Sequence, residues 1–419
     1  MKLTIVLIPK RFYFKILCLV GLCFAFSLNG ASQSLIELKQ LAAEENLELK
    51  ALYKRFEAHL ENVDQAKAWQ DPNLSFGYFI SPIETRVGPQ VARFSLTQML
   101  PWFGTFKTKG NIAAYRAEAE FKQFQDKKLN LFMDVAYKYY DLSALRYIAK
   151  IDVQHLNILK DIKSIVQSNY ENNQVNLSDV LKVELEIERQ QNVISILKDQ
   201  DRAIETQLNQ ILNRPLSTPI VIFNPKQILE LKEPMVLDSI SDAHPRLQRI
   251  QNLQQMTIAK KELARKQTLP QFAFGLDYAI IQDGNGATLD AGQDAIMPMI
   301  SLSLPIFGKK NKSRKKEASL QAESLQHQFK NEITSLQSEM QIAQYQYNTV
   351  LKSYELHDGQ MKKLNDILEL SYSALANAKI DAKEILHLYE EHVLHHKMKV
   401  KTLVELQKIK EKINYLTST

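Results

Sequence analysis

The chain has 419 residues, of which 45% are hydrophobic and 24% are charged, and its formal net charge is +6. This balance does not call for nucleic acid as a partner, since nucleic-acid-binding domains concentrate basic residues on one surface. The sequence contains no nucleophile–base–acid set, no glycine-rich phosphate loop and no paired-cysteine metal motif, so we expect no catalytic residue, no resident metal and no cofactor.

Residues 1–33 have the layout of a secretory signal peptide. Four basic residues precede an apolar run at 16–28, and small and polar residues follow. The run is shorter than the ~20 residues of a spanning helix. We expect cleavage between Gly30 and Ser34. Cleavage would remove the four basic residues, lower the net charge from +6 to +2, and discard both cysteines.

Two stretches, 102–214 and 306–419, contain no proline. Proline costs about 3 kcal/mol inside a helix, so its absence over such lengths indicates helices. Each stretch follows the pattern Leu-Pro-X-Phe-Gly, which contains Pro101 and Gly104 in one copy and Pro305 and Gly308 in the other. We expect these residues to form strand-to-helix junctions in a chain that is an internal duplication.

A β-hairpin precedes each junction, at about 73–100 and 271–305. Apolar side chains alternate with small or polar ones, which is typical of strands. The apolar positions are Leu74, Phe76, Tyr78, Phe272, Phe274, Leu276, Tyr278, Ile300 and Leu302. The alternation leaves two interpretations open. These side chains pack on a soluble core, or they face lipid in a barrel wall whose other face lines a lumen.

Each proline-free stretch predicts a long helical hairpin, at about 107–213 and 309–415. The first helix of each pair would have about 66 residues and a length of about 100 Å. Polar turns interrupt both stretches. Asn176 with Asp179, and Asp381 with Glu384, have the spacing of a capping box at the start of the returning helix.

The predicted organisation is a first repeat at 34–214, an irregular linker at 215–238 and a second repeat at 239–416. Helices at 35–69 and 240–267 lead into the two hairpins. Four strands cannot close a barrel from one chain, but strands from several copies can. The fold class is therefore mostly α with a small β part.

These paired motifs, in this order and over about 34–416, resemble the TolC family of outer-membrane efflux proteins. The resemblance implies a homotrimer with a twelve-stranded transmembrane β-barrel, in contact with outer-membrane lipid, and a periplasmic α-barrel of coiled-coil hairpins. It also implies two protein partners, a periplasmic adaptor and an inner-membrane RND-type pump. The stretch 71–104 looks like members that accompany heavy-metal pumps.

The resemblance also implies functional positions at the two helical tips. Residues matching the adaptor-contact region are Asn173, Val175, Asn176, Asp179, Ala378, Ile380 and Asp381. Glu384 matches an acidic ring at the tunnel entrance, although both it and Asp179 would also suit the first turn of any helix. The chain departs from the family by having Asn173 and Ala378 where glycine is usual. His387 stands where a second acidic residue is common.

Two further clusters have alternative interpretations. His387, Glu391, His392, His395 and His396 include pairs at i,i+4 spacing that suit a metal, but without a ligand from a second helix we expect a polar helix surface. The basic run Lys309, Lys310, Lys312, Arg314, Lys315 and Lys316 would contact anionic lipid or form a positive collar, or else is a solvated first turn.

Together these features predict a passive outer-membrane exit duct of a tripartite efflux or secretion system, with its tunnel in the periplasm. The alternative is a secreted coiled-coil scaffold with two soluble hairpins. The sequence does not identify the exported substrate, because in such systems the pump and the adaptor usually select it.

Overall fold

The computed structural model describes residues 34–222, 224–229, 243–283, 291–306, 308–377 and 379–418. The expected signal peptide, the junction residue Phe307 and the tip residue Ala378 lie outside these ranges. Within them, no helix is both long enough and apolar enough to cross a membrane.

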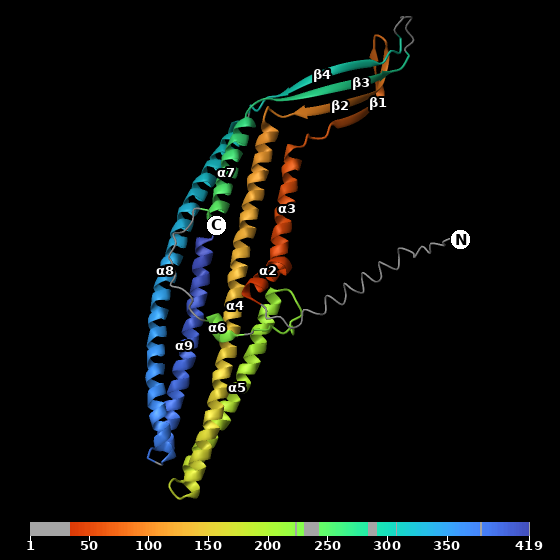
Figure 1. Cartoon of the computed structure of the whole chain (residues 1–419). Helices are drawn as coiled ribbons and strands as arrows, with labels where there is room; N and C mark the ends of the chain where they lie inside the picture. The colour runs from red at the N-terminus through yellow and green to blue at the C-terminus, as the bar shows by residue number, and fades with distance from the viewer. Residues whose placement is uncertain are drawn as a thin grey trace, which may run out of the picture. The chain divides into compact units, whose positions relative to one another are not determined.

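The fold is mostly helical with one small antiparallel sheet, which confirms the predicted fold class (Figure 1). The order helix, two strands and two long helices occurs twice. The elements are α2 Leu35–Glu45, α3 Leu47–Lys67, β1 Asn73–Thr85, β2 Gly88–Leu100, α4 Thr105–Glu171, α5 Leu177–Ile211, α6 Pro225–Leu229, α7 Pro245–Lys266, β3 Gln271–Ile281, β4 Ala295–Ser303, α8 Gly308–Ala376 and α9 Ala382–Thr417.

The chain forms two compact units. We call the one that contains Glu48–Lys127 and Ile240–Glu339 the sheet unit, and the one that contains Lys128–Ser239 and Met340–Leu416 the helical unit. The described residues before Glu48 belong to the helical unit, and Thr417 and Ser418 belong to the sheet unit.

The sheet unit holds all four strands in the order β1-β2-β3-β4, so the two hairpins meet where β2 pairs with β3. The register is nearly unbroken across the sheet. Gly77, Arg93, Ala279 and Ala295 stand in one row. Among the described residues, β1 and β4 are the outer strands, so each has one edge without a partner strand.

Four helices of the sheet unit pack in the order α3, α4, α7, α8. Arg55 of α3 donates to the Glu120 carboxylate of α4 over 2.8 Å. Lys266 of α7 donates to the Thr108 hydroxyl of α4 over 2.8 Å. Arg246 at the start of α7 donates to a Glu339 oxygen of α8 over 3.0 Å. In the described part of this row, α3 and α8 are therefore the outer helices (Figure 1).

The helical unit is held together by apolar side chains from both long hairpins. One buried cluster combines Leu159, Ile162 and Val166 of α4, Val180 and Val183 of α5, Leu375 of α8, and Ile385 and Leu386 of α9. Burial of such side chains contributes about 1.5–3 kcal/mol each. This cluster fixes the two helical tips to one another.

Three local features differ from the sequence-based expectation. The helix expected at 35–69 is broken at Asn46, whose backbone is extended and whose side-chain amide donates to the Ile211 carbonyl over 3.0 Å. A short helix, α6, lies in the segment expected to be irregular. The alternation predicts strands at 74–80 and 92–100 within the first hairpin, but β1 and β2 are longer and meet at a tight turn between Thr85 and Gly88.

Candidate functional site

One face of the sheet carries exposed apolar side chains on all four strands. Phe76, Phe94, Tyr278 and Ile296 form one row across it, and the rings of Phe76 and Phe94 lie 4.9 Å apart. Every position predicted to face lipid is exposed: Leu74, Phe76, Tyr78, Phe272, Phe274, Leu276, Tyr278, Ile300 and Leu302. A soluble monomer rarely leaves so continuous an apolar face uncovered.

The opposite face of the sheet is small and polar. Ser75, Ser95 and Asp277 stand in one row, and Asp277 is only 2% exposed. Arg93 and the Ser95 hydroxyl both donate to its carboxylate. The period-two alternation of β3 predicts Asp277 on this face, opposite Phe274, Leu276 and Tyr278, but it does not predict these two partners, because they belong to the other hairpin.

The two strand-to-helix junctions have different geometry. Gly104 has a φ of +74°, a conformation that a side chain would strain. Its carbonyl accepts a hydrogen bond from Lys266 over 3.0 Å. Gly308 is instead the first residue of α8. Beside the first junction is an apolar pocket of about 540 Å³, lined by Trp69, Leu100, Pro101, Trp102, Phe103, Gly104, Phe106, Phe272 and Phe274.

The first tip joins α4 to α5 without a glycine. Asn173 itself takes the left-handed conformation, with φ at +57°, which asparagine tolerates better than most residues. The Asn176 backbone amide donates to the Asp179 carboxylate over 3.4 Å, as the predicted capping spacing requires. Lys182 also pairs with Asp179 over 2.8 Å, so this carboxylate is partly neutralised.

The second tip joins α8 to α9. The Asp381 carboxylate accepts the backbone N–H of Lys383 over 3.1 Å, which caps the start of α9. Glu384 and His387 both have exposed side chains on the first turns of this helix. His387 Nε2 lies 3.6 Å from a Glu391 oxygen. A ring of Glu384 side chains would need several copies and stays a proposal.

The apolar residues of the two turns are only half-buried. Val175 and Ile380 both pack against the buried cluster that joins the tips. They therefore help to hold the tips together. A substitution at either position would disturb tip packing as well as any contact with a partner.

The histidine cluster has the second-helix neighbour that the sequence did not reveal. His357 of α8 lies with its Nδ1 3.0 Å from Nδ1 of His395. His396 Nε2 lies 3.3 Å from the Tyr147 hydroxyl. Burial, together with His392 and Lys399, lowers the pKa of His396 to about 4, so it is neutral at pH 7. Among the described residues, no three His, Cys, Asp or Glu side chains converge in a metal-binding arrangement.

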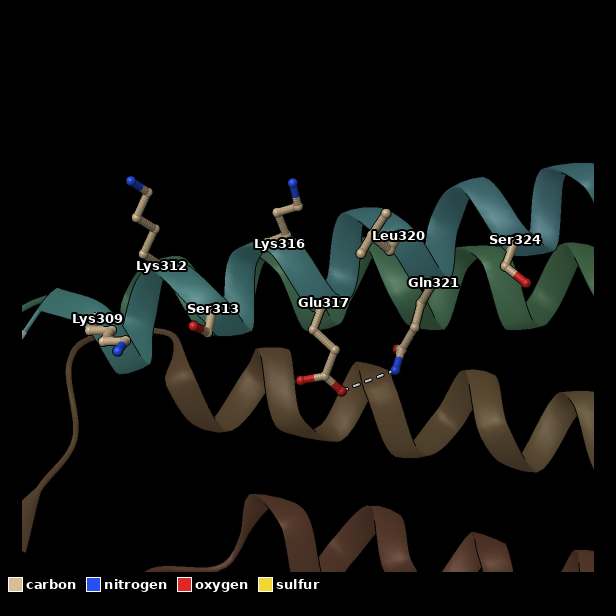
Figure 2. A pocket seen from close by; sticks show the side chains of 8 residues that line it. All are labelled: Lys309, Lys312, Ser313, Lys316, Glu317, Leu320, Gln321 and Ser324. Atoms are coloured by element: carbon tan, nitrogen blue, oxygen red, sulfur yellow. Dashed lines mark hydrogen bonds between the residues drawn. The ribbon is translucent and has the colours of Figure 1, made fainter.

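The basic run at the start of α8 lies on the surface. Figure 2 shows Lys312 and Lys316 pointing away from the other helices drawn. With Lys309, Ser313, Glu317, Leu320, Gln321 and Ser324, they line an open groove of about 790 Å³. Glu317 accepts a hydrogen bond from Gln321 over 3.1 Å. In the described chain, none of these lysines forms an ion pair.

A buried polar network in the helical unit was missed by sequence analysis. Asp152 of α4 is 0% exposed, and its Oδ1 lies 2.5 Å from Lys397 of α9. Gln190 of α5 donates to the same oxygen over 2.7 Å. Asp152, Gln190 and Lys397 are polar residues within helical segments, so from the sequence alone they look like surface positions. No sequence pattern links the three residues to one another.

Comparison with known proteins gives one family match. The model described as outer membrane efflux protein matches residues 38–214. No curated protein matches the chain. The match covers the first repeat and confirms the resemblance that the paired motifs indicated.

Solved structures match over nearly the whole chain. The crystal structure of CusC, described for its folding and transmembrane channel formation, has a TM-score of 0.78 at 14% identity and covers 94% of this chain and 96% of its own. The Campylobacter jejuni CmeC outer membrane channel has a TM-score of 0.72 at 12% identity, with 94% and 90% covered. The open-state Neisseria gonorrhoeae MtrE outer membrane channel has a TM-score of 0.72 at 14% identity, with 91% and 88% covered. At such identities the matches show a shared fold.

Proposed function

We propose that this protein is the outer-membrane exit duct of an efflux or secretion system. The premise is that residues 38–214 match the outer membrane efflux protein family. Substrates would pass through it without chemical change. The observation that carries the proposal is the four-stranded sheet, which is apolar and exposed on one face and polar on the other. A scaffold with soluble hairpins would need its own chain to cover that apolar face.

The duct would be a homotrimer. In the described part of one chain, β1 and β4 each have an edge without a partner strand, and open edges are not tolerated in hydrocarbon. Pairing β4 of one copy with β1 of the next satisfies both edges. Three copies would then give a closed wall of twelve strands, within the range of known transmembrane barrels. The lumen would be lined by the face that carries Ser95 and Asp277.

Export would depend on two partners, a periplasmic adaptor that docks at the helical tips and an inner-membrane RND-type pump that supplies energy. Both follow from the family resemblance. The tips suit docking because each is a short turn with exposed polar side chains on a buried apolar base. Glu384 of each copy would form the acidic ring at the entrance.

The duct proposal is tested by fractionation and conductance. We expect the full chain to sediment with outer membranes and to migrate in unheated gels as an oligomer that heating dissociates. The purified oligomer should conduct ions across a planar lipid bilayer. Recovery as a monomer in the soluble periplasmic fraction would support the scaffold alternative and contradict the duct.

Docking at the tips is best tested by cross-linking, since substitution of Val175 or Ile380 would also loosen tip packing. A photoreactive amino acid at the exposed positions Lys379 or Lys383 is expected to give adducts with the adaptor in cells. The same probe at Lys330, an exposed position of α8 in the sheet unit, serves as the matched control. Equal adduct yields at all three positions, or none at the tips, would count against tip docking.

A further inference from the structure

The outer side of α8 carries a basic stripe that forms no ion pair with any residue that the structure describes. Lys309, Lys312 and Lys316 recur at spacings of three and four residues, so they lie on one side of the helix. All three are exposed, and Leu320 extends the same stripe with an apolar side chain that is 52% exposed. The inner side of α8 bears Ala318 and Arg314, and Arg314 donates to Gln267 beyond the end of α7 over 2.8 Å. The stripe therefore faces away from the rest of its own chain.

The outer side of α3 carries the opposite charge. Phe56 points toward α4, where its ring lies 5.0 Å from that of Phe121. By helical spacing, Glu61 lies on the side of α3 turned away from this contact, and Glu57 and Asp64 lie on the flank next to it. Glu57 pairs with Lys54 over 2.7 Å. The side chains of Glu61 and Asp64 are exposed and form no ion pair with any described residue.

These two stripes lie at the two ends of the helix row and beside the two free edges of the sheet. α3 ends at Lys67 and leads into β1, and α8 begins at Gly308 just after β4. A second copy that paired its β1 with β4 of the first would therefore bring its α3 beside α8. The two helices would run antiparallel, since α3 approaches the sheet and α8 leaves it.

We propose that the basic stripe of α8 binds the acidic stripe of α3 in the next copy of this chain. Counted from the sheet, Lys312 is four residues into α8, and Asp64 is three residues before the end of α3. Lys316 lies one turn further along, level with Glu61. The inference rests on the proposed duct, because strand pairing between copies sets this alignment. What it adds to the duct proposal is a set of charged side chains that would determine which two helices meet and how they are aligned along their axes.

The pairing accounts for charges that are otherwise unexplained. Other lysines of the sheet unit that do pair with a carboxylate include Lys127, with Glu48 at 2.8 Å, and Lys266, with Glu262 at 2.9 Å. Because opposite charges are arranged across the contact, they would select the alignment of the copies.

Cysteine cross-linking tests the contact directly. The only cysteines in the sequence, Cys18 and Cys23, lie in the expected signal peptide. In the double variant Glu61→Cys, Lys316→Cys, mild oxidation of the assembled protein in outer membranes is expected to give covalent dimers and trimers. The matched control Glu61→Cys, Lys310→Cys moves the second thiol to another side of α8, and it should give at most a tenth of the cross-linked product.

Exchanging the charges provides a second test, which does not require two thiols to come within bonding distance. Lys312→Glu with Lys316→Glu should lower the yield of heat-dissociable oligomer several-fold, and adding Glu61→Lys and Asp64→Lys should restore it. If the wild-type oligomer conducts ions but the cysteine variant gives no cross-link and the charge exchange gives no rescue, this interface is overturned and the duct proposal stands. A wild-type chain that forms no oligomer in membranes overturns both.

Discussion

Arginine in place of Ile300 is expected to prevent assembly in the outer membrane. Ile300 is 74% exposed on β4, and it pairs with Phe274 on the apolar face of the sheet. An arginine facing lipid near the bilayer midplane costs about 2–4 kcal/mol, so three copies would lose about 6–12 kcal/mol in total. The measurement is the amount of heat-dissociable oligomer in the outer-membrane fraction.

The neighbouring residue supplies the control for this variant. Ser301 pairs with Ala273 and faces the polar side of the sheet, so Ser301→Arg places the same charge on the proposed lumen wall. We expect Ser301→Arg to assemble at near wild-type levels and to change only conductance. Asp277 is unsuitable as a control because it is buried against Arg93. Equal assembly of the two arginine variants would contradict the lipid-facing assignment.

Lys397→Met is expected to destabilise the helical unit by about 3–5 kcal/mol, the usual cost of leaving a buried charge uncompensated. Asp152 is fully buried, and Lys397 lies 2.5 Å from one of its oxygens. Gln190 would remain as a donor to that oxygen, but it carries no charge. Denaturant unfolding of the detergent-solubilised protein, followed by circular dichroism, measures the loss.

Two comparison variants isolate the buried pair. Lys399→Met removes a lysine that pairs with Asp358, a carboxylate that is 26% exposed and also pairs with Lys362, and pairs that solvent reaches contribute only about 0–1 kcal/mol. Replacing both Asp152 by Leu and Lys397 by Met removes the pair together, and should recover most of the stability lost in Lys397→Met. A single variant no less stable than Lys399→Met would show that solvent reaches Asp152.

The sequence predicts the repeated architecture because each repeat carries strong local signals. Proline avoidance marks the long helices, and period-two alternation marks the strands. The break at Asn46 was not predictable, since it depends on a hydrogen bond to Ile211, far along the chain. The same reason hides the contact of His357 with His395 and the pair of Arg93 with Asp277. Each is a tertiary contact between residues that look like surface positions.

β1 is longer than β4. This difference affects which part of the protein would be exposed outside the cell. β4 has nine residues and begins at Ala295, in the row with Gly77, whereas β1 continues to Thr85. Transmembrane strands need only about 9–11 residues. If the same row continued between copies, the outer edge of β1 past Gly77 would have no residue of Ala295–Ser303 in a neighbouring copy to bond. Its backbone groups would have to be hydrated, so the β1–β2 turn would rise above the lipid headgroups, where antibodies or phage could recognise it.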